Sequence, residues 1–216
     1  MNWSYRLVWL TSRLLFSTWL PTRFLHGDRV PLTGPVILAS NHASVLDPPL
    51  VGSGFNRMVN YLARDTLFNI PLFGAGLRSL KVVPVDREGG GGAGLKAILT
   101  RLLQGGIILL FPEGTRTEDG QLQPAKSGIG LTVIKSTAPV VPIRILGTYD
   151  ALGRRHQWPR PGRLTIIYGH PLDFKALREE AKTCPKPRLK EIYQQVADEI
   201  MERIAKLPEE ENILPR

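Results

Sequence analysis

The sequence predicts a single α/β domain with a mostly parallel central sheet flanked by helices. Short apolar runs alternate along the chain with segments whose apolar residues recur every three to four positions. Strands separated by helices in this way favour a parallel, buried sheet. The 216 residues, 43% of them hydrophobic, suit one domain with a sizeable core. We assign residues 28–216 to this domain and residues 1–27 to a separate N-terminal segment.

The N-terminal segment, residues 1–27, combines aromatic side chains with Arg6, Arg13 and Arg23. Only nine uncharged residues separate Arg13 from Arg23, too few for a membrane-spanning helix, which needs about 20. The segment also lacks the unbroken apolar centre of a cleaved signal peptide. We expect an amphipathic helix that lies in the headgroup zone of a membrane. A helix that packs on the domain with its arginines in water is the alternative.

Five apolar runs predict buried strands, at residues 35–39, 81–85, 107–111, 140–146 and 164–168. Apolar residues at helical spacing predict amphipathic helices over residues 95–103 and 188–207. Gly105 and Gly106 end the first of these helices. Residues 89–94 are rich in glycine and predict a flexible loop. This loop is not a phosphate-binding loop, because Leu95 stands where that motif requires lysine.

The charge and the cysteine count narrow the function classes. A net charge of +9 favours a polyanionic partner, which can be nucleic acid, an anionic membrane or a phosphorylated substrate. The single cysteine, Cys184, excludes an internal disulfide. No cluster of cysteine and histidine has the spacing of metal ligands, so we expect no metal site.

A histidine and an aspartate follow the first predicted strand. His42 and Asp47 are five residues apart, so they would point to different sides of a single helix. Pro48 disfavours the α conformation at Asp47 and suits the first position of a helix. We therefore expect Asp47 at the N-cap and His42 in the preceding loop, with the carboxylate folded back onto the imidazole. Such a pair can act as a general base with its orienting partner; a capping aspartate beside an unrelated histidine is the alternative.

A second polar loop, Phe111-Pro112-Glu113-Gly114-Thr115-Arg116, follows the strand at residues 107–111. Its glycine allows backbone amides to approach a ligand, and its arginine offers a two-pronged donor for phosphate. Lys126 and Gly128 come shortly afterwards, and Arg87 follows the strand at residues 81–85. The alternative for the loop is an ordinary polar turn, and for each cation a solvated surface charge.

Together these segments resemble the 1-acylglycerol-3-phosphate O-acyltransferase family, whose members carry an H-x4-D motif. The resemblance covers about residues 35–146, in six ordered blocks: Asn41-His42-x4-Asp47, Pro71-Leu72-Phe73-Gly74, Val85-Asp86-Arg87, Phe111-Pro112-Glu113-Gly114-Thr115-Arg116, Lys126-x-Gly128 and Val141-Pro142-Ile143. It implies that His42 is the general base and Asp47 its partner. It also implies that the strand at residues 140–143 lines the acyl site. For the phosphorylated acceptor it implies six binding residues: Arg87, Glu113, Gly114, Thr115, Arg116 and Lys126. One departure is Ala125, because family members often have an aromatic residue before the lysine.

The activity that the resemblance implies is transfer of a fatty-acyl chain from acyl-CoA or acyl-[acyl carrier protein] to lysophosphatidic acid, which gives phosphatidic acid in phospholipid biosynthesis. No acyl-enzyme is expected, because the chain has no G-x-S-x-G nucleophile motif. No metal or bound organic cofactor is implied, since the acyl thioester is a co-substrate. We expect a protein at the cytoplasmic face of a membrane, peripheral or monotopic, that binds an anionic lipid surface.

Two alternatives stay open on the sequence. The acceptor can instead be glycerol-3-phosphate or another lysolipid, or the protein can be a non-catalytic basic binder of membranes. Arg154, Arg155, Arg160 and Arg163 would suit a binder. They come without a recognised nucleic-acid motif, so we expect no nucleic-acid partner, and a binder would leave the His–Asp pair unexplained.

Overall fold

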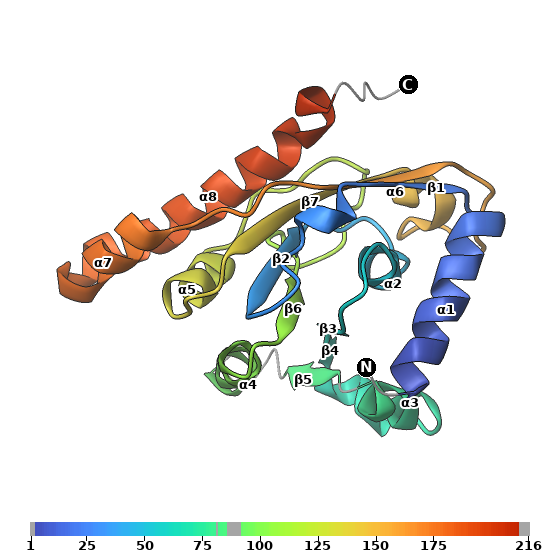
Figure 1. Cartoon of the computed structure of the whole chain (residues 1–216), viewed down its shortest axis with the longest axis horizontal. Helices are drawn as coiled ribbons and strands as arrows, with labels where there is room; N and C mark the ends of the chain where they lie inside the picture. The colour runs from blue at the N-terminus through green and yellow to red at the C-terminus, as the bar shows by residue number, and fades with distance from the viewer. Residues whose placement is uncertain (1–2, 81, 86–91, 212–216) are drawn as a thin grey trace.

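The central sheet is built from the apolar runs of the sequence. In the computed structural model, which describes residues 3–80, 82–85 and 92–211, six strands lie side by side (Figure 1). Their order is β1 (Thr22–Leu25), β8 (Leu164–Tyr168), β7 (Val140–Leu146), β2 (Val36–Ser40), β6 (Ile107–Leu110) and β3 (Val59–Asn60). All neighbours run parallel except the antiparallel pair β7 and β8. The predicted α/β class with a mostly parallel sheet is confirmed.

One predicted strand lies outside this sheet. The apolar run at residues 81–85 forms a strand only from Val83, as β5 (Val83–Val85), and Lys81 lies outside the described residues. β5 pairs in parallel with β4 (Leu62–Arg64) in a separate two-stranded sheet. A short apolar run therefore indicated a strand correctly without indicating which strand would pair with it.

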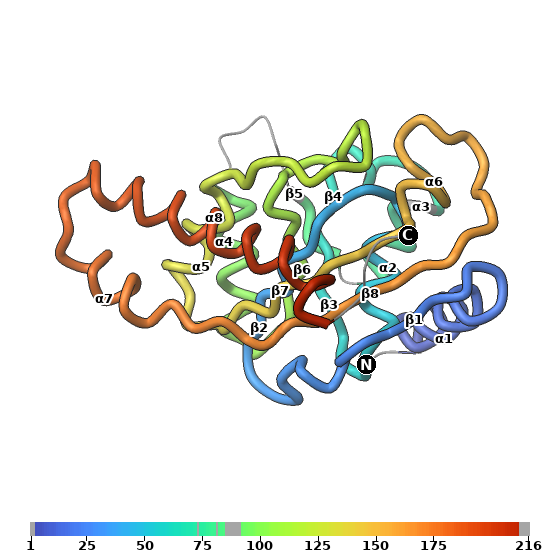
Figure 2. Tube along the Cα trace, turned by 90° about the horizontal axis from the view of Figure 1, so that it is seen from above, coloured from blue at the N-terminus to red at the C-terminus, as the bar shows by residue number. Residues whose placement is uncertain are grey.

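Helices cover both faces of the central sheet. They are α1 (Trp3–Thr18), α2 (Asp47–Ser53), α3 (Phe73–Ser79), α4 (Gly92–Leu103), α5 (Gly128–Ile134), α6 (Thr148–Leu152), α7 (Lys175–Thr183) and α8 (Lys186–Glu210), with short 3-10 turns η1 (Gly27–Arg29) and η2 (Asp65–Asn69). α1 and α2 contribute to one core cluster, and α4, α5 and α8 to the other. Figure 2 shows α7 and α8 at one end of the molecule and α1 at the other. Because both faces are covered, every residue of β2 is buried.

The two predicted amphipathic helices are present, with longer bounds. In α8 the residues Ile192, Val196, Ile200 and Ile204 are fully buried, as their spacing predicted. α4 begins at Gly92, so Gly92–Gly94 belong to a helix and not to the expected loop; residues 86–91 lie outside the described residues. Tertiary packing of Ile98 and Leu102 outweighs the low helix propensity of these glycines.

The N-terminal segment takes part in the fold. Phe16 and Leu20 are fully buried in the core, and β1 pairs with β8 at the edge of the sheet. The division of the chain at residue 27 stays a prediction, but the residues before it contribute a strand and core side chains. Among the described residues, no helix has both the length and the apolar character required to cross a membrane.

Candidate functional site

The loop after β2 is held firmly in place by its own backbone and by its neighbours. Asn41, the first residue after β2, exchanges two hydrogen bonds with the backbone of Ile145: its Nδ2 donates to the carbonyl oxygen at 3.0 Å, and its Oδ1 accepts from the N–H at 2.7 Å. Ser44 Oγ donates to the carbonyl oxygen of Leu152 at 2.7 Å. These bonds tie the loop to β7 and α6, so His42 between them has a defined position.

His42 and Asp47 form the predicted pair. His42 Nδ1 lies 2.9 Å from Asp47 Oδ2, and the aspartate side chain is completely buried. The same Oδ2 accepts the backbone N–H groups of Ala43 and Ser44, both at 2.7 Å. A carboxylate oxygen only accepts hydrogen bonds, so Nδ1 is the donor in this pair, and in the neutral imidazole Nε2 keeps its lone pair. No described residue hydrogen-bonds to Nε2, and the histidine is 18% exposed.

The start of α2 differs from our expectation by one residue. We expected Asp47 at the N-cap and Pro48 as the first helical residue, but α2 begins at Asp47 and its N-cap is Leu46. The aspartate side chain accepts the N–H groups of Ala43 and Ser44, which precede it, so it closes the histidine loop and does not cap the helix. Pro48 has no N–H to offer, and a proline in the first turn costs little because those N–H groups have no partner inside the helix.

The neighbouring strand β6 supplies a second set of contacts to His42. The ring of Phe111, the residue after β6, stacks on the imidazole with a centroid distance of 3.8 Å and an interplanar angle of 14°. Glu113 Oε1 accepts the backbone N–H of His42 at 3.0 Å, and Thr117 N–H donates to the His42 carbonyl oxygen at 2.9 Å. The two polar loops of the sequence therefore form one site, because β2 and β6 are parallel neighbours. The contribution of Phe111 was not predicted, although the ring directly precedes the loop motif.

Glu113 is turned into the protein. It is only 2% exposed, and its contact with the His42 backbone makes it a positioning residue for the loop. Burial raises the pKa of Glu113, while backbone N–H groups of His42 and Gln123 and the charge of Arg144 oppose this rise. Its predicted contact with the acceptor stays a prediction.

Arg144 on β7 was not singled out by the sequence. Its Nε and Nη1 are buried without a hydrogen-bond partner among the described residues, as are Glu113 Oε2 and Asp47 Oδ1. Burial lowers the pKa of Arg144, and the negative charge of Glu113 opposes this shift. The opposite charges of Arg144 and Glu113 therefore each favour the charged form of the other. The sequence offered one signal for Arg144, namely a single arginine inside the apolar run of β7.

Two cavities meet at His42. The α1 cavity, of about 400 Å³, runs between α1, α2 and α3 and is lined mainly by apolar side chains, among them Trp9, Leu77 and Leu80. The α5 cavity, of about 440 Å³, runs between β6, α4 and α5. Four residues line both: His42, Pro48, Tyr61 and Leu62. A group with a free ring nitrogen at the junction of two cavities can act on two molecules that enter from different sides.

The predicted phosphate-binding cations are divided between these spaces. Arg116 lines the α1 cavity and also a polar cleft of about 660 Å³ that Thr115 helps to form. Lys126 and Gly114 line the α5 cavity. Gly114 has φ +72°, and a Cβ there would lie 3.1 Å from Lys126 Cδ, so glycine suits this approach. Arg87 lies outside the described residues.

The strand at residues 140–143 does not have its expected place. Val140, Val141 and Ile143 are fully buried in the core, and none of them lines either cavity at His42. Their side chains pack within the two core clusters, so they present no surface to either cavity. Apolar residues of α1, α2 and α3 line the α1 cavity instead.

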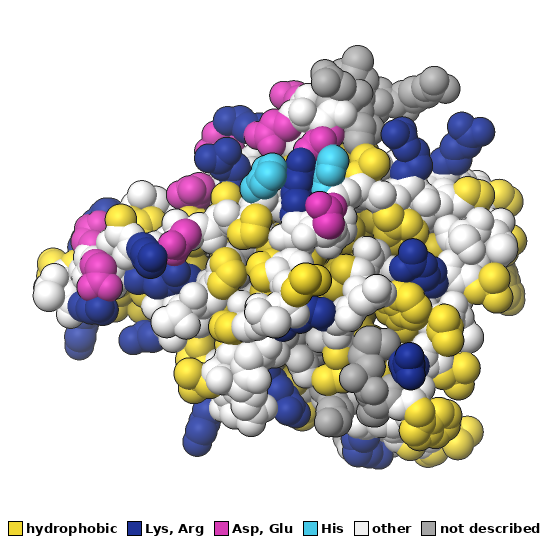
Figure 3. Space-filling model, in the orientation of Figure 1, with side chains coloured by type: hydrophobic (Ala, Val, Ile, Leu, Met, Phe, Trp, Pro, Cys, Tyr) yellow, Lys and Arg dark blue, Asp and Glu magenta, His cyan; other side chains and the backbone are white. Residues whose placement is uncertain are grey.

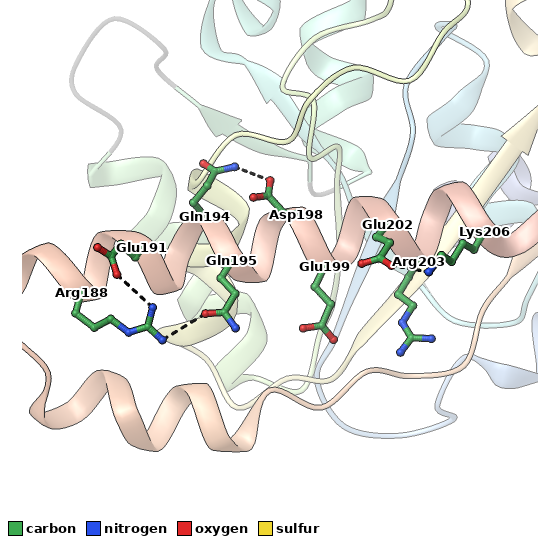
Figure 4. Close-up of a pocket in the computed structure, with 9 residues that line it drawn as sticks. All are labelled: Arg188, Glu191, Gln194, Gln195, Asp198, Glu199, Glu202, Arg203 and Lys206. Carbon is green, nitrogen blue, oxygen red and sulfur yellow. Dashed lines mark hydrogen bonds and ion pairs between the residues drawn. The ribbon is translucent and has the colours of Figure 1, made fainter.

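A larger surface hollow, of about 980 Å³, lies along the outer side of α8 (Figure 4). Its polar side chains bind one another: Arg188 Nη1 lies 3.3 Å from Glu191 Oε2, and Gln194 Nε2 lies 2.7 Å from Asp198 Oδ1. It contains no residue of the His42 site. Within residues 3–80, 82–85 and 92–211, no group of His, Cys, Asp and Glu side chains is arranged to hold a metal ion, and the absence of a cofactor stays a prediction.

Comparison with known proteins gives one family match. The family model described as Acyltransferase matches residues 23–146, which contain both polar loops and Lys126. A 1-acyl-sn-glycerol-3-phosphate acyltransferase of Bacillus subtilis (strain 168) is 28% identical over 146 residues, which are 67% of this chain and 70% of the relative. A chloroplastic relative of the same description from Brassica napus, BAT2, is 34% identical over 116 residues, which are 53% of this chain and 33% of the relative. The chain thus spans about a third of the plant protein's length.

A solved structure has the same fold. The crystal structure of the 1-acyl-sn-glycerophosphate (LPA) acyltransferase PlsC from Thermotoga maritima aligns with a TM-score of 0.72 and 23% identity, over 92% of this chain and 79% of that chain. The likeness extends beyond the family match, into the C-terminal helices that carry no sequence signature.

Proposed function

This chain belongs to the acyltransferase family, and on that premise we propose that it transfers a fatty-acyl chain from a thioester donor to the free hydroxyl of lysophosphatidic acid. The observation that carries the proposal is the His42–Asp47 pair at the junction of two cavities, each of which holds one predicted phosphate-binding cation. The alternative of a non-catalytic membrane binder gives no account of a buried aspartate that orients a histidine with a free ring nitrogen.

His42 Nε2 takes the proton of the acceptor hydroxyl while the oxygen attacks the thioester carbonyl carbon. Asp47 accepts the Nδ1–H bond at 2.9 Å and stabilises the imidazolium that forms. The C–S bond then breaks, the thiolate leaves, and the imidazolium returns its proton to the sulfur. The ester product and free thiol are released without an acyl-enzyme. The thiol is the carrier, coenzyme A or acyl carrier protein.

The test is incubation of the full chain with a radiolabelled acyl thioester and lysophosphatidic acid, with phosphatidic acid as the expected product. The same assay with glycerol-3-phosphate and with a lysolipid lacking a terminal phosphate defines the acceptor. Acyl-CoA and acyl-[acyl carrier protein], compared at equal concentration, define the donor. Absence of transfer to every acceptor from either donor would reject the proposal.

We expect Arg116→Ala to lower kcat/KM for lysophosphatidic acid about 10- to 150-fold. A charge-assisted hydrogen bond contributes roughly 1.5–3 kcal/mol, and Arg116 lines the α1 cavity together with His42. The measurement is steady-state kinetics with the acceptor varied. Arg163→Ala is the matched control, because Arg163 is exposed and directly precedes β8. It lines neither the α1 cavity, nor the α5 cavity, nor the polar cleft beside Thr115.

Lys126→Ala and Arg87→Ala should act in the same direction. If all three variants kept wild-type acceptor kinetics, the acceptor would carry no phosphate. The division of Arg116 and Lys126 between two cavities adds a finer expectation: a cation that binds the acceptor phosphate raises the acceptor KM, whereas one that binds the donor raises the donor KM.

The outer face of α1 supports a peripheral position on a membrane. Trp3, Leu7, Leu10 and Leu14 follow one another at helical spacing and are 52–77% exposed. The opposite face packs inward through Tyr5 and Phe16. In Figure 3, hydrophobic side chains lie with Lys and Arg side chains over α1, while acidic side chains gather over α7 and α8. Such a helix lies in the interface of an anionic bilayer.

We expect the double variant Leu10→Ser/Leu14→Ser to sediment less with anionic vesicles than the wild type, because the apolar area that leaves water is smaller. Added salt should release part of the bound protein by screening the arginines. Leu32→Ser is the control, since Leu32 is 83% exposed but lies in the loop that enters β2. These substitutions keep β1 and the core residues Phe16 and Leu20, which a truncation at residue 28 would remove. Equal sedimentation of the double variant and the wild type would exclude α1 as the anchor.

A further inference from the structure

The turn between η2 and α3 exposes two large apolar side chains. Leu72 is 90% exposed and Ile70 48% exposed, and the intervening Pro71 is exposed as well. Neither Leu72 nor Ile70 belongs to a core cluster. Internal packing within the described protein therefore gives no reason for apolar residues at this turn. Isolated exposed apolar residues are common on proteins, but these two differ from most in their backbone conformation and their position.

The backbone holds Leu72 in a conformation that leucine rarely adopts. Its φ of 63° and ψ of −52° lie near the rare γ-turn conformation. The turn is closed by a hydrogen bond from Gly74 N–H to the Ile70 carbonyl oxygen at 2.8 Å. A Cβ on Gly74 would lie 2.1 Å from the carbonyl oxygen of Phe68, so the chain packs tightly there. The turn is thus a rigid support that projects Leu72 outward.

The position of the turn relates it to the site. In the chain the turn comes after β3, β4 and η2, whereas His42 follows β2, which β6 separates from β3 in the sheet. Leu67 of η2 and Leu77 of α3 line the α1 cavity opposite Val8 and Trp9 of α1. The elements that carry the turn, η2 and α3, therefore line the α1 cavity opposite the inner face of α1, whose outer face carries the apolar stripe.

The charges around the turn suit an anionic surface. Arg64 and Arg78 flank it and are both exposed, and Asp65 is the single acidic residue between them. Arginines beside projecting apolar side chains are typical of segments that enter the headgroup layer of a membrane.

We propose that the turn at residues 70–72 inserts Ile70 and Leu72 into the apolar layer of an anionic membrane. Together with the outer stripe of α1, it seats the opening of the α1 cavity against the bilayer, so that the chain of a lipid substrate passes from the membrane toward His42 between the two elements. The lipid passage rests on the proposed function, whereas the membrane contact does not. The described residues of the Pro71-Leu72-Phe73-Gly74 block line neither cavity at His42, and the membrane contact gives this block a role.

The test compares Leu72→Ser with Leu103→Ser in the full chain. Leu103 is 88% exposed, but it ends α4, which leads into the amino end of β6. The His42 site lies at the other, carboxyl end of that strand. Partitioning onto vesicles of phosphatidylcholine with phosphatidylglycerol is measured by sedimentation. We expect Leu72→Ser to lower the partition coefficient about tenfold, as expected when most of a leucine side chain no longer leaves water. We expect Leu103→Ser to change it less than about twofold, as for an ordinary surface substitution.

Leu72→Gly controls for folding. Glycine adopts a positive φ without strain, so its Tm should equal or exceed that of the wild type, while its vesicle binding should fall as with serine. Wild-type binding by both Leu72 variants would overturn the proposal, and so would an equal loss in Leu103→Ser. Turnover of a dispersed short-chain acceptor is measured in parallel and should match the wild type in both Leu72 variants. If the wild type itself lacks that turnover, the proposed function fails and the vesicle comparison still decides the membrane contact.

Discussion

Replacing His42 with alanine is expected to lower kcat about 10²- to 10⁴-fold with little change in fold or vesicle binding. General-base assistance contributes a factor of this size, which corresponds to about 3–5 kcal/mol of activation free energy. The ring is 18% exposed and lies at the junction of the two cavities, so its loss leaves the binding surfaces of both in place. The measurement is single-turnover transfer from a preformed complex with the acyl thioester, which separates chemistry from substrate binding.

His170→Ala is the matched control for this substitution. His170 is exposed and follows β8. Because β8 runs antiparallel to β7, His170 lies at the opposite end of the strands from the His42 site. It should retain full activity. Circular dichroism must show that both variants are folded. A folded His42→Ala protein with near-wild-type kcat would contradict the general-base mechanism and would leave His42 with a structural role.

Asp47→Asn is expected to lower kcat on the order of 10²-fold, less than His42→Ala. The asparagine oxygen can still accept the N–H groups of Ala43 and Ser44, so the loop and the histidine tautomer are retained. The negative charge that stabilises the imidazolium is lost. The amide NH2 then occupies the place of Asp47 Oδ1, which is buried without a partner. A buried unsatisfied donor costs about 1–3 kcal/mol, so the Tm should fall as well.

The expected pattern is a large fall in kcat with an almost unchanged KM for both substrates, because Asp47 acts through His42 and lines neither cavity. Asp150→Asn provides the comparison, since Asp150 is exposed in the first turn of α6. A change in KM alone, with kcat preserved, would show that Asp47 only shapes the loop. A fall in Tm with full kcat would lead to the same conclusion.

Local signals in the sequence were sufficient for five strands, for the helices α4 and α8 and for the pair at the site. The apolar run at residues 140–146 and the stripe Ile192, Val196, Ile200 and Ile204 became β7 and α8 as predicted. Both patterns depend only on residues close together in the chain, because the helix and strand periods repeat within a few residues. The return of Asp47 onto His42 was likewise predictable, because only four residues lie between them.

The tertiary structure decided which segments meet. Strand order is set by packing over the whole sheet, so the sequence could not show that β5 pairs with β4, or that the loops after β2 and β6 face each other. For the same reason the stacking of Phe111 on His42 and the charge of Arg144 beside Glu113 came only from the fold. The division of Arg116 and Lys126 between two cavities also depends on contacts between residues far apart in the chain. By itself, then, the sequence determined the α/β class, five of the strands and the helices α4 and α8, and it predicted the residues for the chemistry. Only the tertiary structure decided how those residues share two cavities, because that arrangement depends on long-range packing, which leaves no periodic trace in the chain.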